Sequence, residues 1–145
     1  MNIKTTAHLQ LLIAQEILSA EGDEVVADIY AVVEKLRILE QPRQVIPIIF
    51  LWAEENHPYL IDHDPFLLFI EEQIDFLPAL EESINRKPTA LTIWIVHRLA
   101  NGETDHSKVN HWIAVLEKIL RHPQTDEICR EDAESFISYQ MKRHV

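Results

Sequence analysis

The chain has 145 residues, 47% of them hydrophobic, which suits a single folded domain over residues 1–145 with a substantial core. Its 13 Lys and Arg against 24 Asp and Glu give a net charge of −11, which disfavours direct nucleic-acid binding because phosphates repel such a chain. The only glycines, Gly22 and Gly102, cannot form a glycine-rich phosphate or dinucleotide loop, and the single Cys129 cannot form an internal disulfide.

The N-terminal residues carry apolar side chains at helical spacing. Residues 6–20 predict an amphipathic helix rather than a signal peptide, with Glu16, Ile17 and Ala20 on its inner side. Gly22 is expected to end this helix and Asp23 to cap a second helix over about 24–39. The longest apolar run, "VIPIIFLWA", has nine residues, whereas a membrane helix needs about 20, so a cytoplasmic protein is expected.

Prolines divide the middle of the chain into shorter helices. Pro42 fits a helix start, and the helix is expected to continue to about Glu55. After a polar loop, Asp64 and Pro65 look like an N-cap and the first helical residue. Residues 65–75 and 76–86 then predict two short helices, or one helix bent at Pro78.

The segment that follows, "PTALTIWIVHRLANG", predicts a buried helix because it is apolar nearly all round. Thr89 supplies its start and Gly102 its stop, although the β-branched residues leave a strand as the alternative. Arg98 then needs a carboxylate partner or must reach the surface. His97 is interpreted as a core histidine bonded to backbone rather than as a general base.

Two more helices, over about 106–121 and 127–142, complete the expected architecture. The sequence therefore predicts an all-α fold, a compact single-domain bundle of seven to eight short helices. A HEAT-like stacking of helix pairs is left open, since no fixed-period repeat is visible.

Catalytic and metal signatures are weak. No H-E-x-x-H motif and no nucleophile elbow occur, and Cys129 is expected to pack as a small apolar side chain. The loop carrying His57, Asp62, His63 and Asp64 has zinc-compatible ligands without a known strong spacing. The prediction is a protein that is not an enzyme and binds no metal or cofactor, with a metal-dependent enzyme using His57 and His63 as a competing hypothesis.

The charge map is more informative. No Lys or Arg occurs between Arg43 and Arg86, and a one-sign surface in this window would speed encounter with a basic partner. We therefore assign partner binding to the acids of this window: Glu54, Glu55, Asp62, Asp64, Glu71, Glu72, Asp75, Glu81 and Glu82. An ordinary acidic surface is the alternative. Tyr59 could anchor such a contact, whereas Phe66 and Phe69 are expected to be buried.

One stretch resembles a known group of proteins. "LEESINRKPTALTIWIVHRLANG", preceded by "DPFLLFIEEQID" and followed by "AESFISYQ", resembles the small helical immunity proteins of bacterial contact-dependent-inhibition and polymorphic-toxin systems. The likeness covers about residues 62–140. It is carried by an S-I-x-R-x-P-T run, a T-[IV]-W helix and an N-G end: Ser83, Ile84, Arg86, Pro88, Thr89, Thr92, Ile93, Trp94, Arg98, Asn101 and Gly102.

The resemblance implies a non-catalytic inhibitor that binds a cognate toxin C-terminal domain in the cytoplasm and blocks its active site. Many such toxins are nucleases with basic grooves, which an acidic inhibitor can fill in place of phosphates. The matching run itself is interpreted as structural, so the acidic window is the expected toxin face. A helical adaptor for another assembly is the alternative function, and a homodimer is left open.

Overall fold

Helices dominate the fold, as the sequence predicts. The computed structural model describes residues 2–21, 24–56 and 64–143. Within these ranges eight α-helices follow one another: α1 (Thr6–Gln15), α2 (Ile29–Arg37), α3 (Ile46–Asn56), α4 (Asp64–Glu72), α5 (Leu77–Arg86), α6 (Ala90–Asn101), α7 (His106–Arg121) and α8 (Glu127–Arg143). A short 3₁₀ helix, η1 (Pro42–Val45), leads into α3 with Pro42 in its first turn.

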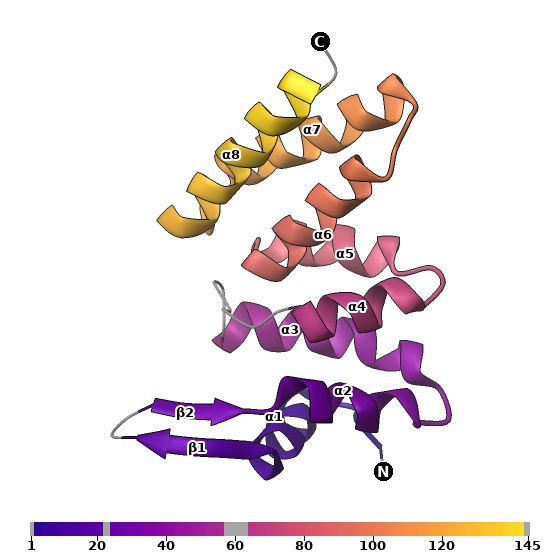
Figure 1. The fold of residues 1–145 in the computed structure, drawn as a ribbon, viewed down its shortest axis with the longest axis vertical. Helices are drawn as coiled ribbons and strands as arrows, with labels where there is room; N and C mark the ends of the chain where they lie inside the picture. The colour runs from indigo at the N-terminus through magenta and orange to yellow at the C-terminus, as the bar shows by residue number, and fades with distance from the viewer. Residues whose placement is uncertain (1, 22–23, 57–63, 144–145) are drawn as a thin grey trace.

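The helices stack as successive pairs in two rows (Figure 1). In one row α3 packs against both α1 and α5, and in the other α4 joins α2 to α6, which in turn contacts α8. Helix α7 closes the column against α6 and α8. This alternation is the pairing that the HEAT-like interpretation describes, in which each pair buries its apolar face against the next.

The segment after α1 differs from the expected helix. Helix α1 ends at Gln15, and the antiparallel strands β1 (Ile17–Glu21) and β2 (Glu24–Ala27) follow it. These strands replace the end of the helix predicted over 6–20 and the start of the helix predicted over about 24–39. The prediction that placed Ile17 and Ala20 on an inner helix face is therefore wrong. Short β-branched runs do not distinguish strand from helix by periodicity alone, and Gly-Asp between two such runs favours a hairpin.

The second helix consequently starts later than predicted. Its N-cap is Asp28, whose carboxylate accepts a hydrogen bond from the backbone N–H of Ala31 at 3.1 Å. The expected stop at Gly22 and cap at Asp23 lie outside the described residues.

Helix α6 forms as predicted and supplies the centre of the column. Thr89 and Thr92 form a reciprocal capping box at its start, and Gly102 follows its last residue. Its buried apolar side chains join those of every other helix: Leu9, Leu36, Ile49, Phe50, Trp52, Phe66, Phe69, Leu80, Leu91, Ile93, Ile95 and Leu116 among them. Among the described residues, no helix has both the length and the apolar character needed to cross a bilayer.

Candidate functional site

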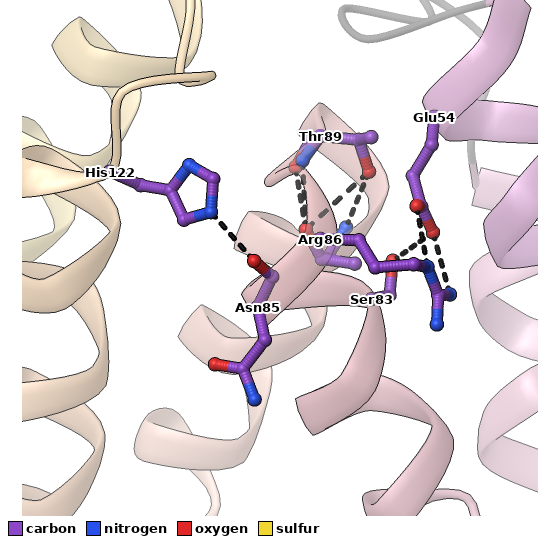
Figure 2. A network of polar contacts seen from close by, with 7 residues as sticks. Glu54, Ser83, Asn85, Arg86, Thr89 and His122 are labelled. Atoms are coloured by element: carbon purple, nitrogen blue, oxygen red, sulfur yellow. Dashed lines mark hydrogen bonds and ion pairs between the residues drawn. The ribbon is translucent and has the colours of Figure 1, made fainter.

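Glu54, the first acid assigned to partner binding, lies inside the protein on α3 with 7% of its surface exposed. One carboxylate oxygen accepts a hydrogen bond from Arg86 Nε at 2.8 Å (Figure 2). The other accepts from Arg86 Nη2 at 2.9 Å and from Ser83 Oγ at 2.7 Å. A buried carboxylate needs such partners because burying it unpaired costs several kcal/mol. Glu54 thus fastens α3 to α5, and its carboxylate is buried and paired rather than part of an unpaired acidic surface.

The run that carries the family resemblance has structural partners of this kind. Ser83 and Arg86 hold Glu54, and the hydrogen bond that Arg86 donates to Glu54 is the leading cause of a raised Arg86 pKa. Three residues after Arg86, the backbone N–H of Thr89 donates to Thr92 Oγ1 at 2.9 Å in the capping box that starts α6 (Figure 2). The run therefore joins α3, α5 and α6, as the interpretation of a structural role expects.

Glu71 and Glu72 are also occupied. Arg98 of α6 donates to Glu71 from Nε at 2.6 Å and from Nη2 at 2.9 Å, which confirms the expected carboxylate partner for Arg98. Arg37 of α2 donates to Glu72 from Nε at 3.0 Å and from Nη2 at 2.7 Å. Both pairs use the two-pronged fork of the guanidinium, so α4 is held on both sides by arginines from outside the acidic window.

Besides the paired Glu72, four acids of the window are exposed among the described residues. The exposed side chains of Glu55, Asp75 and Glu81 make no ion pair or hydrogen bond with any residue the structure describes. Glu82 is exposed near Arg86 and contributes to raising the Arg86 pKa. Asp75 is also the non-glycine residue with a positive φ, 65°, a conformation that Asp tolerates better than most side chains.

These acids do not share one face. Glu55 lies near the end of α3, on the side of the column where α4 begins. Asp75 lies in the turn after α4, on the opposite side of the column (Figure 1). Asp62 and Tyr59 lie outside the described residues, as does the side chain of Asp64. The prediction of one continuous, unpaired acidic face over 54–82 is therefore wrong, because arginines from α2, α5 and α6 fold against part of it.

Further exposed acids lie on α8, which the sequence analysis did not select. Glu127, Glu131 and Glu134 are exposed and stand four and three residues apart, so they follow one side of the helix. The helical spacing of these three acids is visible in the sequence, but Arg130 lies among them, so the segment is not a run of one charge sign.

His97 lies in an aromatic cluster between α6 and α8. Its ring stacks on Phe136 at 3.9 Å between centroids with 12° between the planes. Asn101 faces its Nε2 at 3.3 Å, and the Asn101 side-chain oxygen accepts from Gln140 at 2.6 Å and from Arg143 at 3.0 Å. Because that oxygen is taken, the Asn101 amide must donate to His97, so Nε2 is the acceptor and the proton sits on Nδ1.

This arrangement keeps the ring neutral. Burial, and then the charge of Arg143, lower the pKa of His97 from 6.5. Its partner is a side-chain amide rather than the backbone group expected from the sequence, and the buried Nδ1 has no hydrogen-bond partner among the described residues. His97 is a packing residue with a neutral ring.

A hollow of about 300 Å³ is lined by residues of α5 and α7. At its edge, His122 donates from Nε2 to the backbone oxygen of Asn85 at 2.8 Å (Figure 2), and its Nδ1 accepts from Gln124 N at 3.0 Å. The lining mixes one carboxylate, one ammonium group, one amide, one imidazole and aliphatic side chains: Glu81, Ile84, Asn85, His111, Ala114, Val115 and Lys118. Such a balanced lining does not select one ligand chemistry.

No group of three His, Cys, Asp or Glu side chains with metal-binding geometry occurs in residues 2–21, 24–56 and 64–143. The proposed ligands His57, Asp62 and His63 lie outside these ranges. The chain matches no known family model, no curated protein and no solved structure. Function is therefore inferred from this chain's own residues and contacts.

The Glu54 network predicts a stability difference between two adjacent glutamates. Glu54→Gln should lower the free energy of unfolding by about 2 kcal/mol, because the charge-assisted bonds to α5 are weakened while Arg86 remains partly screened by water. Glu55→Gln, next to it but exposed, should change it by no more than about 0.5 kcal/mol. Urea unfolding of both variants measures the difference, and equal effects would contradict the assigned role of Glu54.

The His97 environment predicts a loss of stability in acid. Since the folded-state pKa lies below the unfolded value of 6.5, the unfolded chain binds the proton more readily, and stability falls as pH drops through that value. Unfolding at about pH 7.5 and about pH 5.5 should show this loss, and His97→Gln should reduce it. His8→Gln, at an exposed position, serves as the control, and an unchanged pH dependence in His97→Gln would refute the assignment.

Cys129 should be unreactive in the folded protein. Burial first, and then the neighbouring Asp126, raise the Cys129 pKa from 9.0 to about 12, and the reactive thiolate is therefore scarce near neutral pH. A disulfide reagent should modify the thiol only after denaturant is added, whereas a Cys129→Ser, Ser138→Cys variant should react at once from its exposed position. Rapid labelling of the unchanged folded chain would show that this environment is described incorrectly.

Proposed function

We propose that this chain is a non-catalytic immunity protein, which binds a basic toxin domain in the cytoplasm and blocks it. The residue pattern over about 62–140 suggests the class. The stacked helix pairs support a binding role, because such a column presents a broad rigid surface made of helix faces and turns. A toxin that cleaves nucleic acid is the favoured partner, since its groove must attract phosphates.

The observation that carries this proposal is an excess of carboxylates that internal pairing cannot remove. With 24 acids and 13 Lys and Arg, pairing every cation with one acid would still leave 11 carboxylates without one. Glu55, Asp75 and Glu81 are exposed members of this excess, and Glu127, Glu131 and Glu134 add to it on α8. A surface of this charge favours a basic partner and speeds the encounter with it.

The stacking also favours a second candidate, a helical adaptor within another assembly. Two-row stacks of helix pairs are a general architecture for protein binding, and they do not by themselves select a toxin. The two candidates differ in the partner: an immunity protein protects cells from one toxin domain, whereas an adaptor gives no such protection.

Co-expression tests the proposal directly. The chain should restore growth to cells that produce the toxin domain encoded by the adjacent gene, and a variant chain with a stop codon in α3 should not. The purified pair should bind with an affinity that falls as salt rises, because charge attraction between exposed groups is screened. An adjacent gene that encodes no toxin domain, or a toxin domain that kills regardless of this chain, would contradict the proposal.

A further inference from the structure

One side of the column carries exposed apolar side chains in successive turns. The turn edge is defined here as residues 38–45, between α2 and α3, and residues 73–77, which follow α4 and end with Leu77, the first residue of α5. Both segments lie on the same side of the stack, and the connection 102–105 continues that side (Figure 1). Ile38 is 84% exposed, Ile74 75% and Leu77 41%. Single exposed apolar residues are common, but three in adjacent turns form a patch that calls for a partner.

The Arg37–Glu72 pair brings these residues together. Arg37 is the last residue of α2 and Glu72 the last of α4, and the two forked bonds between them hold the helix ends side by side. Ile38 follows directly after Arg37, and Ile74 comes two residues after Glu72. Ile38 and Ile74 are therefore exposed next to two helix ends that this ion pair ties together.

Carboxylates occur in the same connections as the apolar residues. Glu40 and Asp75 are exposed and have no ion pair or hydrogen bond within the described part of the chain. The next connection adds Glu103 and Asp105, and hydrogen bonds from Ser107 lower the Asp105 pKa so that it stays charged. Arg43 is the exposed cation of the first turn. Acids thus outnumber cations around the patch.

We infer that the turn edge is the surface that receives the partner, and that the partner presents an apolar side chain flanked by Lys or Arg. An apolar centre with a charged rim is the usual anatomy of a protein interface, and the sign of the rim sets the sign of the partner. This inference rests on the proposed function and names the face that the toxin domain contacts. It moves the contact from the helix faces of the acidic window to the turns.

A second copy of the chain fits this surface poorly. In a two-fold dimer the same patch meets itself, so Glu40 and Asp75 would face the equivalent carboxylates of the partner copy. Like charges placed across an interface are unfavourable, and a basic partner has no such conflict.

Binding of variants to the catalytically inactivated toxin domain of the adjacent gene tests the inference. Ile38→Thr with Ile74→Thr should weaken binding at least about tenfold, because it removes the centre of the patch. Asp75→Asn should weaken it about threefold, mainly by slowing association, since Asn tolerates the same positive φ and only the charge is lost.

A matched control separates the turn edge from exposed surface in general. Leu11→Thr removes a side chain that is 64% exposed on α1, away from the turn edge, and should bind within about twofold of the unchanged chain. Melting temperatures of all variants should match, because every substituted side chain is exposed. Hydrogen exchange in the complex, which needs no variant, should show protection in residues 38–45 and 73–77.

The possible results distinguish the two levels of the proposal. If the unchanged chain does not bind the toxin domain, both the function and the surface are overturned. If it binds but the turn-edge variants bind equally well and exchange protection lies elsewhere, only the surface is overturned. A dimer in sedimentation that dissociates in the Ile38→Thr, Ile74→Thr variant would identify a second copy as the occupant and overturn the inference of a basic partner.

Discussion

The buried carboxylate of Glu54 is the constraint on which the arrangement of the central helices depends. A carboxylate on an otherwise apolar face of α3 is stable only where donors meet it, and Arg86 and Ser83 of α5 supply three hydrogen bonds. This fixes the rotation of α5 against α3. Because Pro88 and the Thr89 cap follow within a few residues, it also fixes where α6 begins and how the second row is placed.

The same principle recurs on both sides of α4. Arg98 binds Glu71 and Arg37 binds Glu72. Together with Arg86, these arginines come from three different helices and pair with acids of residues 44–85, a segment that contains no Lys or Arg. These pairs have consequences for function as well as for packing. They tie Glu54, Glu71 and Glu72 to arginines within the fold, whereas the exposed carboxylates in turns and on α8 are the groups that the proposed basic partner would meet. The acidic character of the protein and its structural ion pairs are therefore separate features.

Much of the helical architecture could be predicted from the sequence, because its signals are local. Thr89 and Gly102 bound α6, and apolar spacing locates α7 and α8 to within a residue of their observed ends. The β-hairpin was missed because Ile17, Val25 and Val26 suit either a strand or a helix in so short a run. The ion pairs could not be predicted, since residues 54 and 86 or 37 and 72 become neighbours only through the stacking of the pairs. The same is true of the turn edge: neither Ile38 nor Ile74 is unusual until the ends of α2 and α4 lie together.

The most direct test of the central constraint is a double-mutant cycle between Glu54 and Arg86. If the two side chains stabilise the fold through each other, Glu54→Gln and Arg86→Gln should together cost less than the sum of their separate effects, with a coupling free energy of about 1–3 kcal/mol. Glu82 paired with Arg86 in a parallel cycle should couple by less than about 0.5 kcal/mol, because that carboxylate is exposed and screened. Strictly additive effects at Glu54 and Arg86 would contradict the view that this pair holds α3 against α5.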